Sequence, residues 1–302
     1  MSILLAVFAA VANAVATVLQ RLGVESATSG NRTSKKLMAA VMRRPIWFVG
    51  LALTTASFLL QSVALAYGNL TSVQPVMVTE IVFLVLILGT WFHQRLGWRE
   101  WVGTIGTAVG LGVFLGLSYS RRGVGQPDNE DWILLLATAG AAVIITLVAA
   151  RHGPRSFRAA AYGVSAGIVF ALTATFIKTV ANEWQHGLAY VFSHPAAYAV
   201  AASGLVGLVI SQHALEAGPV AASQASLLIA NPLSSIVIGI WLFSDHVHAT
   251  GARAVVEGVF LGVMFSSLLI LAQSPLVSTS REAELLTKRR VVTDAPVGTP
   301  VP

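Results

Sequence analysis

Residues 64–91 read ALAYGNLTSVQPVMVTEIVFLVLILGTW, and this stretch decides the fold. After the small-residue turn at Gly68, residues 72–92 form an apolar run that is long enough to cross a bilayer as a helix, which takes about 20 residues. Glu80 is the one charged residue of this run. The stretch therefore predicts a transmembrane helix with an acidic group inside the hydrocarbon region.

The rest of the chain has the same character. Of its 302 residues, 55% are hydrophobic and 11% are charged, whereas a soluble domain has about 25% charged residues. So few charges cannot cover a water-facing surface. The sequence predicts an all-α, polytopic membrane bundle of nine spans: residues 2–20, 46–68, 72–92, 100–119, 131–150, 158–181, 195–216, 221–243 and 252–273. The first run lacks a basic start and is followed by further spans, so we expect a retained span rather than a signal peptide.

The basic residues give an orientation. With nine spans, 15 Lys and Arg residues fall in loops on one side and three on the other. Since cytoplasmic loops carry the excess of positive charge, we expect a multi-pass protein of the cytoplasmic membrane with its N-terminus outside and its C-terminus in the cytoplasm. The net charge of +6 is explained in this way, and no nucleic-acid partner is expected. The 15 residues are Arg21, Arg32, Lys35, Lys36, Arg43, Arg44, Arg95, Arg99, Arg151, Arg155, Arg158, Arg281, Lys288, Arg289 and Arg290.

The chain repeats itself at an offset of 150 residues. Residues 214–241 read ALEAGPVAASQASLLIANPLSSIVIGIW, and the echo of the first copy extends from residue 64 to residue 113. Spans two to four therefore resemble spans seven to nine. The identical pairs are Ala64/Ala214, Leu65/Leu215, Gly68/Gly218, Gln74/Gln224, Gly89/Gly239, Trp91/Trp241, Val109/Val259, Leu111/Leu261, Gly112/Gly262 and Val113/Val263.

The first span echoes the sixth at an offset of 157, and this echo includes the basic pair Arg21/Lys178. Five spans separate each helix from its counterpart, and an odd separation makes the two copies cross the membrane in opposite directions. Such inverted repeats are typical of secondary transporters. We expect a 4+1+4 organisation: a first repeat (1–119), a connecting span (120–157), a second repeat (158–273) and a polar cytoplasmic tail (274–302).

The two copies around Gly68 and Gly218, and the glycine-rich stretch GTIGTAVGLGVFLG at residues 103–116, resemble the EamA-like branch of the drug/metabolite transporter (DMT) superfamily. The resemblance covers most of residues 2–273. It implies a secondary transporter that alternates access around a central site.

The chain departs from that family in two ways. The family usually has ten spans, and a glutamate commonly follows the third helix of each half, where Gln94 and Asp245 lie here. Nine spans and an outside N-terminus look more like the NIPA-like branch, for which magnesium transport is implied. The substrate is thus either a metabolite or drug-like molecule or Mg²⁺.

Glu80 is the first candidate for a functional residue, because an ionisable group in a span is usually functional or paired. Its carboxylate either binds a cation, in which case it is also the candidate metal ligand, or carries a proton. The alternative is a structural ion pair with Lys178.

Three amides are further candidates for the ion or substrate pathway. Gln224 and Asn231 are seven residues apart, so they share a face of the eighth span. Asn231 precedes Pro232, where we expect a kink whose freed carbonyls line a cavity. Gln74–Pro75 is the repeat-related element of the third span. The alternative is that these amides join helices to one another.

Asn13 and Gln20 lie about two turns apart in the first span and are candidates for the same cavity. Gln61 in the second span and Gln212–His213 in the seventh lie in repeat-related helices. His213 is either a proton relay or pH sensor, or a buried, hydrogen-bonded side chain. Arg253 and Glu257 are expected to form a local ion pair.

No zinc-peptidase, esterase or nucleotide-binding motif occurs, and we expect neither an enzyme nor a cofactor. The chain has no cysteine, which excludes disulfides and thiol chemistry. Gly106 and Gly110 have the spacing that lets helices pack closely. The sequence neither predicts nor excludes a homodimer in the lipid bilayer. The alternative function is a non-transporting accessory subunit of an envelope or lipid-handling complex.

Overall fold

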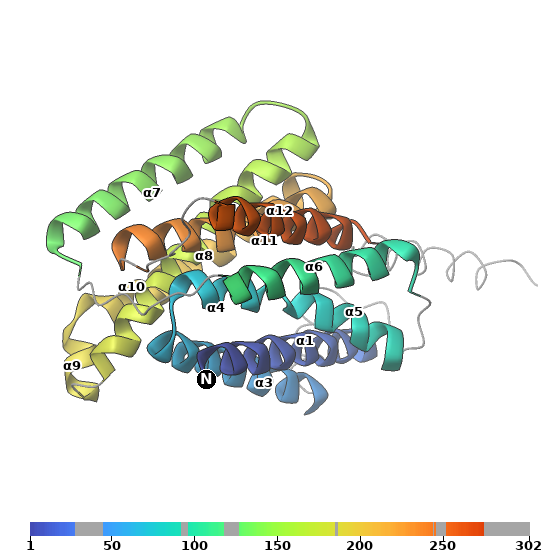
Figure 1. Cartoon of the computed structure of the whole chain (residues 1–302), viewed down its shortest axis with the longest axis horizontal. Helices are drawn as coiled ribbons and strands as arrows, with labels where there is room; N and C mark the ends of the chain where they lie inside the picture. The colour runs from blue at the N-terminus through green and yellow to red at the C-terminus, as the bar shows by residue number, and fades with distance from the viewer. Residues whose placement is uncertain are drawn as a thin grey trace, which may run out of the picture.

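The computed structural model describes residues 1–27, 45–91, 96–117, 127–184, 187–243, 245 and 252–274, and these residues form helices and no strands. Nine helical segments within these ranges are long and apolar enough to cross a membrane. The prediction of an all-α polytopic bundle with nine spans is confirmed for this part of the chain. The helices lie side by side in one bundle (Figure 1). They are α1 (Ser2–Ala27), α3 (Pro45–Tyr67), α4 (Leu70–Met77), α5 (Glu80–Trp91), α6 (Trp98–Leu117), α7 (Asn129–Ala149), α8 (Arg155–Glu183), α9 (Leu188–Ser193), α10 (Pro195–Ala217), α11 (Val220–Leu242) and α12 (Ala252–Ala272).

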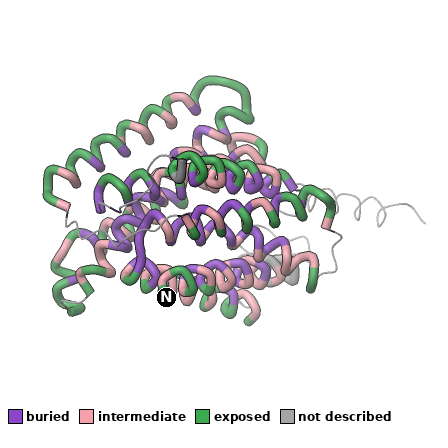
Figure 2. The backbone as a smooth tube through the Cα atoms, viewed as in Figure 1, coloured by how far each residue is buried: buried purple, intermediate pink, exposed green. Residues whose placement is uncertain are grey.

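α8 lies at the centre of the bundle and α7 lies at its edge. The most apolar window of α8 is 67% buried, whereas that of α7 is 11% buried, and Figure 2 shows α7 mostly exposed along its length. Small residues explain the position of α8, since Gly163 and Gly167 bring its backbone against the backbone of α11. The carbonyl of Ser223 and the amide nitrogen of Asn231 occupy the space that a Cβ at these glycines would take. This close approach places Asn231.

A second close approach joins α6 to α12. A Cβ at Gly110 would lie 2.7 Å from the amide nitrogen of Met264, and one at Gly106 would collide with Ser267. By contrast, a Cβ at Gly112 or Gly116 would meet nothing within 4 Å. The predicted packing role of Gly106 and Gly110 is therefore confirmed.

The third span is broken into two helices. α4 ends at Met77 and α5 begins at Glu80, and the two residues between them form a turn. Pro75 has no amide hydrogen for the helical ladder. After Pro75 the backbone forms a tighter, three-residue turn. The Thr79 amide donates to the Val76 carbonyl at 3.0 Å, and the Thr79 hydroxyl donates to the same oxygen at 2.7 Å. Residues 72–92 are thus not the continuous helix that the sequence predicts.

The eighth span remains a single helix. α11 is helical from Val220 to Leu242 with Pro232 inside it, so the interruption lies after Pro75 and not at Pro232. The side chain of Arg253 and residues 275–302 lie outside the described part, as does the expected pairing of Arg253 with Glu257.

Candidate functional site

A cavity of about 250 Å³ lies between the first three spans and α11. α1, α3 and the broken third span supply most of its wall, and α11, from the second half of the chain, supplies the rest. Its polar and apolar lining residues are Asn13, Thr54, Ser57, Phe58, Gln61, Gln74, Met77, Val78, Glu80, Leu227, Leu228 and Asn231. The cavity therefore contains four of the predicted pathway residues: Asn13, Gln74, Glu80 and Asn231.

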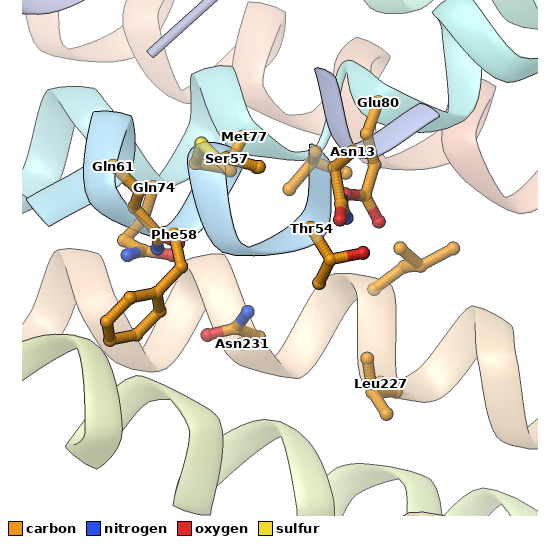
Figure 3. A pocket seen from close by; sticks show the side chains of 12 residues that line it. Asn13, Thr54, Ser57, Phe58, Gln61, Gln74, Met77, Glu80, Leu227 and Asn231 are labelled. Atoms are coloured by element: carbon orange, nitrogen blue, oxygen red, sulfur yellow. Dashed lines mark hydrogen bonds between the residues drawn. The ribbon is translucent and has the colours of Figure 1, made fainter. Parts of the chain in front are cut away.

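Glu80 enters the cavity because of the break in the third span. It is the first residue of α5, and the partial positive charge at a helix N-terminus favours a carboxylate there. The side-chain amide of Asn13 on α1 donates a hydrogen bond to Glu80 Oε2. Figure 3 shows the two side chains facing each other, with Thr54 below them. α1 thus fixes the position of the carboxylate, and Asn13 is its observed partner.

The hydroxyl groups of the wall are already engaged. Ser57 Oγ donates to the Ala9 carbonyl at 2.7 Å, and Thr54 Oγ1 donates to the Gly50 carbonyl at 3.1 Å. Gln20 Nε2 donates to Thr54 Oγ1 at 2.9 Å. Gln20 therefore supports the wall from behind and does not line the cavity.

Two amides in the wall have unmatched polar atoms. Gln74 is 2% exposed, and its Nε2 has no hydrogen-bond partner among the described residues; the same holds for Asn231 Oδ1. A buried amide atom without a partner costs about 1–3 kcal/mol. Figure 3 shows Gln61 and Gln74 together at one end of the cavity, with Asn231 projecting from α11. Both residues line the cavity, and the two unmatched atoms are buried in its wall.

Lys178 is not the partner of Glu80. Its Nζ lies 3.3 Å from Asp245 Oδ1, and both side chains are almost fully buried. The ammonium also lies 4.2 Å from the centre of the Phe243 ring. The predicted alternative of a Glu80–Lys178 pair is wrong, because Lys178 forms its ion pair with Asp245, which follows α11.

Gln224 and His213 lie outside the cavity. Gln224 shares the helix face of Asn231, but seven residues of helix separate them by about 10 Å along the axis, and the cavity ends before that. His213 is exposed on α10, and one ring nitrogen lies 2.8 Å from the Val209 carbonyl of its own helix. Gln212 is exposed as well. The structure does not bring these three residues to the site.

Several wall residues have no counterpart among the sequence-based candidates. Thr54 and Ser57 lie at helical spacing with Gln61 on one face of α3, and this spacing is a signal that could have revealed them. Phe58, Met77 and Leu227 are apolar residues in apolar spans, so nothing in the sequence distinguishes them.

Among the described residues that line the cavity, Glu80 is the one with a carboxylate. Among the described residues, no group of three or more His, Cys, Asp and Glu side chains could hold a metal ion. The remaining oxygens of the wall come from amides and hydroxyl groups.

The chain is 25% identical over 279 residues to the uncharacterized protein Cgl0250/cg0304 of Corynebacterium glutamicum. The alignment covers 90% of this chain and 96% of that relative. No family model matches the chain, and no solved structure matches it.

Proposed function

We propose that this protein is a secondary transporter that moves a small solute across the cytoplasmic membrane by alternating access. The observation that carries the proposal is the carboxylate of Glu80 at the start of a half-helix, inside a cavity with unmatched amide groups. Transporters commonly bind substrates at such breaks, near the middle of the membrane and between repeats.

The packing of the helices supports two equivalent halves. α1 packs mainly against α3 and the α4–α5 pair, and α8 packs mainly against α10 and α11, which hold the corresponding places in the second copy. α6 and α12, the last span of each copy, pack against each other. This pattern is what an inverted 4+1+4 repeat predicts, and we propose it together with the DMT-like, EamA-like assignment.

The chemistry of the cavity favours an organic solute over Mg²⁺. Mg²⁺ demands several oxygen ligands and retains its waters, and a hydrated ion presents O–H donors only. It would leave the N–H groups of Gln74 without an acceptor. A solute with a positively charged nitrogen and an acceptor oxygen satisfies Glu80, Gln74 and Asn231 together. The cavity volume of about 250 Å³ is smaller than the roughly 300–1,000 Å³ of pockets that bind drug-sized ligands. It therefore favours a smaller metabolite.

Thermal stabilisation of the purified protein tests the proposal. A ligand that binds the folded state raises the melting temperature. We expect an amine-bearing metabolite in a panel to stabilise the wild type and not Glu80→Gln. Glu100→Gln is the matched control, since Glu100 is a buried acid that accepts a hydrogen bond from Ser274, away from the cavity. Stabilisation by Mg²⁺ that Glu80→Gln abolishes would move the assignment to the NIPA-like cation reading.

A non-transporting accessory subunit is the competing function. It predicts that no solute stabilises the protein and that the tail is essential. Truncation after Ser274 tests this without removing the Ser274–Glu100 hydrogen bond. Loss of the cellular phenotype on truncation, with no solute binding in the wild type, would favour the accessory subunit.

A further inference from the structure

A buried charge cluster joins the two halves at one end of the bundle. Lys178 belongs to α8, and Asp245 follows α11. The second oxygen of Asp245, Oδ2, accepts from the amide and the hydroxyl of Thr71, each at 3.4 Å. Thr71 is in the first turn of α4, so the cluster crosses from the second half of the chain to the first.

The carboxylate of Asp245 caps the N-terminus of α4. The first amides of a helix have no partner within it, and the N-cap residue of α4, Asn69, makes no side-chain cap hydrogen bond. The carboxylate of Asp245 supplies the acceptor from the other half, where the helix dipole favours a negative charge. The Asp245 carboxylate therefore accepts hydrogen bonds from the first turn of α4 and forms an ion pair with Lys178.

The fit around the cluster is tight. The Asp245 amide donates to the Gly239 carbonyl at 3.0 Å. A Cβ at Gly239 would lie 2.8 Å from both Asp245 Oδ2 and Thr71 Cγ2. The side chain of Asp245 is fully buried. The backbone of α11 thus fixes the carboxylate against the first turn of α4.

α4 carries this contact directly to the cavity. Gln74, one turn after Thr71, lines the cavity, and Glu80 begins α5 after the break. α4 is only eight residues long, so a displacement of its first turn displaces Gln74 and the break. The hydrogen bonds between Thr71 and Asp245 cross from one half of the chain to the other, whereas the Lys178–Asp245 pair lies wholly within the second half.

We propose that Asp245, neutralised by Lys178, is the closure that seals the cavity at the Thr71 end and positions Gln74 and the break before Glu80. Release of Thr71 from Asp245 opens that end. This inference rests on the proposed function, because a closure has a use only if the cavity opens in turn to each side. Asp245 is a positioning residue, since it acts on the solute through α4.

Single-cysteine labelling tests the closure, and the cysteine-free chain requires no background changes. Gln61→Cys places a thiol in the cavity wall, and Leu188→Cys, on the exposed α9 that follows α8, reports which membrane face the Lys178 end occupies. A membrane-impermeant maleimide is applied to intact cells and to inverted vesicles. We expect Asp245→Asn to raise the labelling rate of Gln61→Cys at least tenfold from the face that labels Leu188→Cys, and not from the opposite face.

Two further variants separate opening from misfolding. The double variant Lys178→Met/Asp245→Asn leaves no unpaired buried charge, and we expect it to be folded and equally open. The variant Asp245→Glu keeps the carboxylate, and we expect labelling within about threefold of the wild-type rate. An unchanged labelling rate in both open variants, or an equal rise from both faces, would overturn the closure.

The solute experiment distinguishes this inference from the proposed function. Unchanged labelling with Glu80-dependent stabilisation overturns the closure alone. One-sided labelling in a protein that no solute stabilises overturns the transporter proposal and leaves the closure in place.

Discussion

At the scale of single residues, polar groups in apolar spans were the predictable part of the site. Asn13, Gln74, Glu80 and Asn231 stand out in the sequence because each interrupts a long apolar run, whatever its partner is. Their meeting in one cavity follows from the packing of α8 on α11 and from the break after Met77. The partner of Lys178 was not predictable, because Asp245 lies 67 residues away and outside the spans.

Asn231 and Gln224 give a matched residue-scale prediction. Both are amides on one face of α11, and Asn231 alone lines the cavity. We expect Asn231→Leu to raise the dissociation constant of the stabilising solute about fivefold, since one lost hydrogen bond is worth about 1 kcal/mol. Gln224→Leu should change it less than twofold. Isothermal titration on both variants checks this, and equal losses would remove Asn231 from the site.

At the scale of secondary-structure elements, span positions were predictable and the broken third span was not. Hydropathy locates a span by length and composition. Pro75 and Pro232 each remove one helical hydrogen bond, so the sequence gives no reason to choose between them. Tertiary contacts decide: α4 is capped by Asp245 and α11 is held along its length by α8.

Pro75→Ala tests the cause of the break. Alanine restores the amide and favours a continuous helix. We expect hydrogen exchange at Thr79 and Glu80 to slow at least tenfold and solute binding to weaken, because Glu80 no longer begins a helix. Pro232→Ala, in a helix that is already continuous, should leave exchange at both amides unchanged. Unaltered exchange in Pro75→Ala would show that the proline does not cause the break.

The contact between α6 and α12 gives a stability prediction. In Gly110→Ala the new methyl group meets the backbone at Phe260 and Met264, and such overpacking costs about 1–3 kcal/mol. Gly112→Ala adds the same group where nothing lies within 4 Å, and it should stay within about 1 kcal/mol of the wild type. Thermal melts in detergent compare the two, and similar melting temperatures would contradict the contact.

At the scale of the whole molecule, composition and hydropathy were sufficient to predict an all-α bundle of nine spans, since lipid must solvate what charge does not cover. The orientation and the inverted repeat remain predictions from the basic loops and the internal echo. The orientation in the membrane cannot be obtained from helix packing, because a bundle packs equally well in both orientations.

Cysteine labelling tests the orientation. His152 is exposed in the turn after α7, within a basic loop that we expect in the cytoplasm, and Leu188 is exposed near the opposite end. An impermeant maleimide should label Leu188→Cys in intact cells and label His152→Cys only after permeabilisation. The reverse pattern would invert the orientation and leave the fold unchanged.

Uptake into proteoliposomes tests the central claim most directly. The solute that stabilises the purified protein is supplied in radiolabelled form to vesicles containing wild type, Glu80→Gln or Glu100→Gln. We predict saturable uptake by the wild type and by Glu100→Gln, and uptake by Glu80→Gln no greater than by protein-free vesicles. Uptake by Glu80→Gln at the wild-type rate, or a wild type that binds the solute without moving it, would contradict a transporter built around this carboxylate.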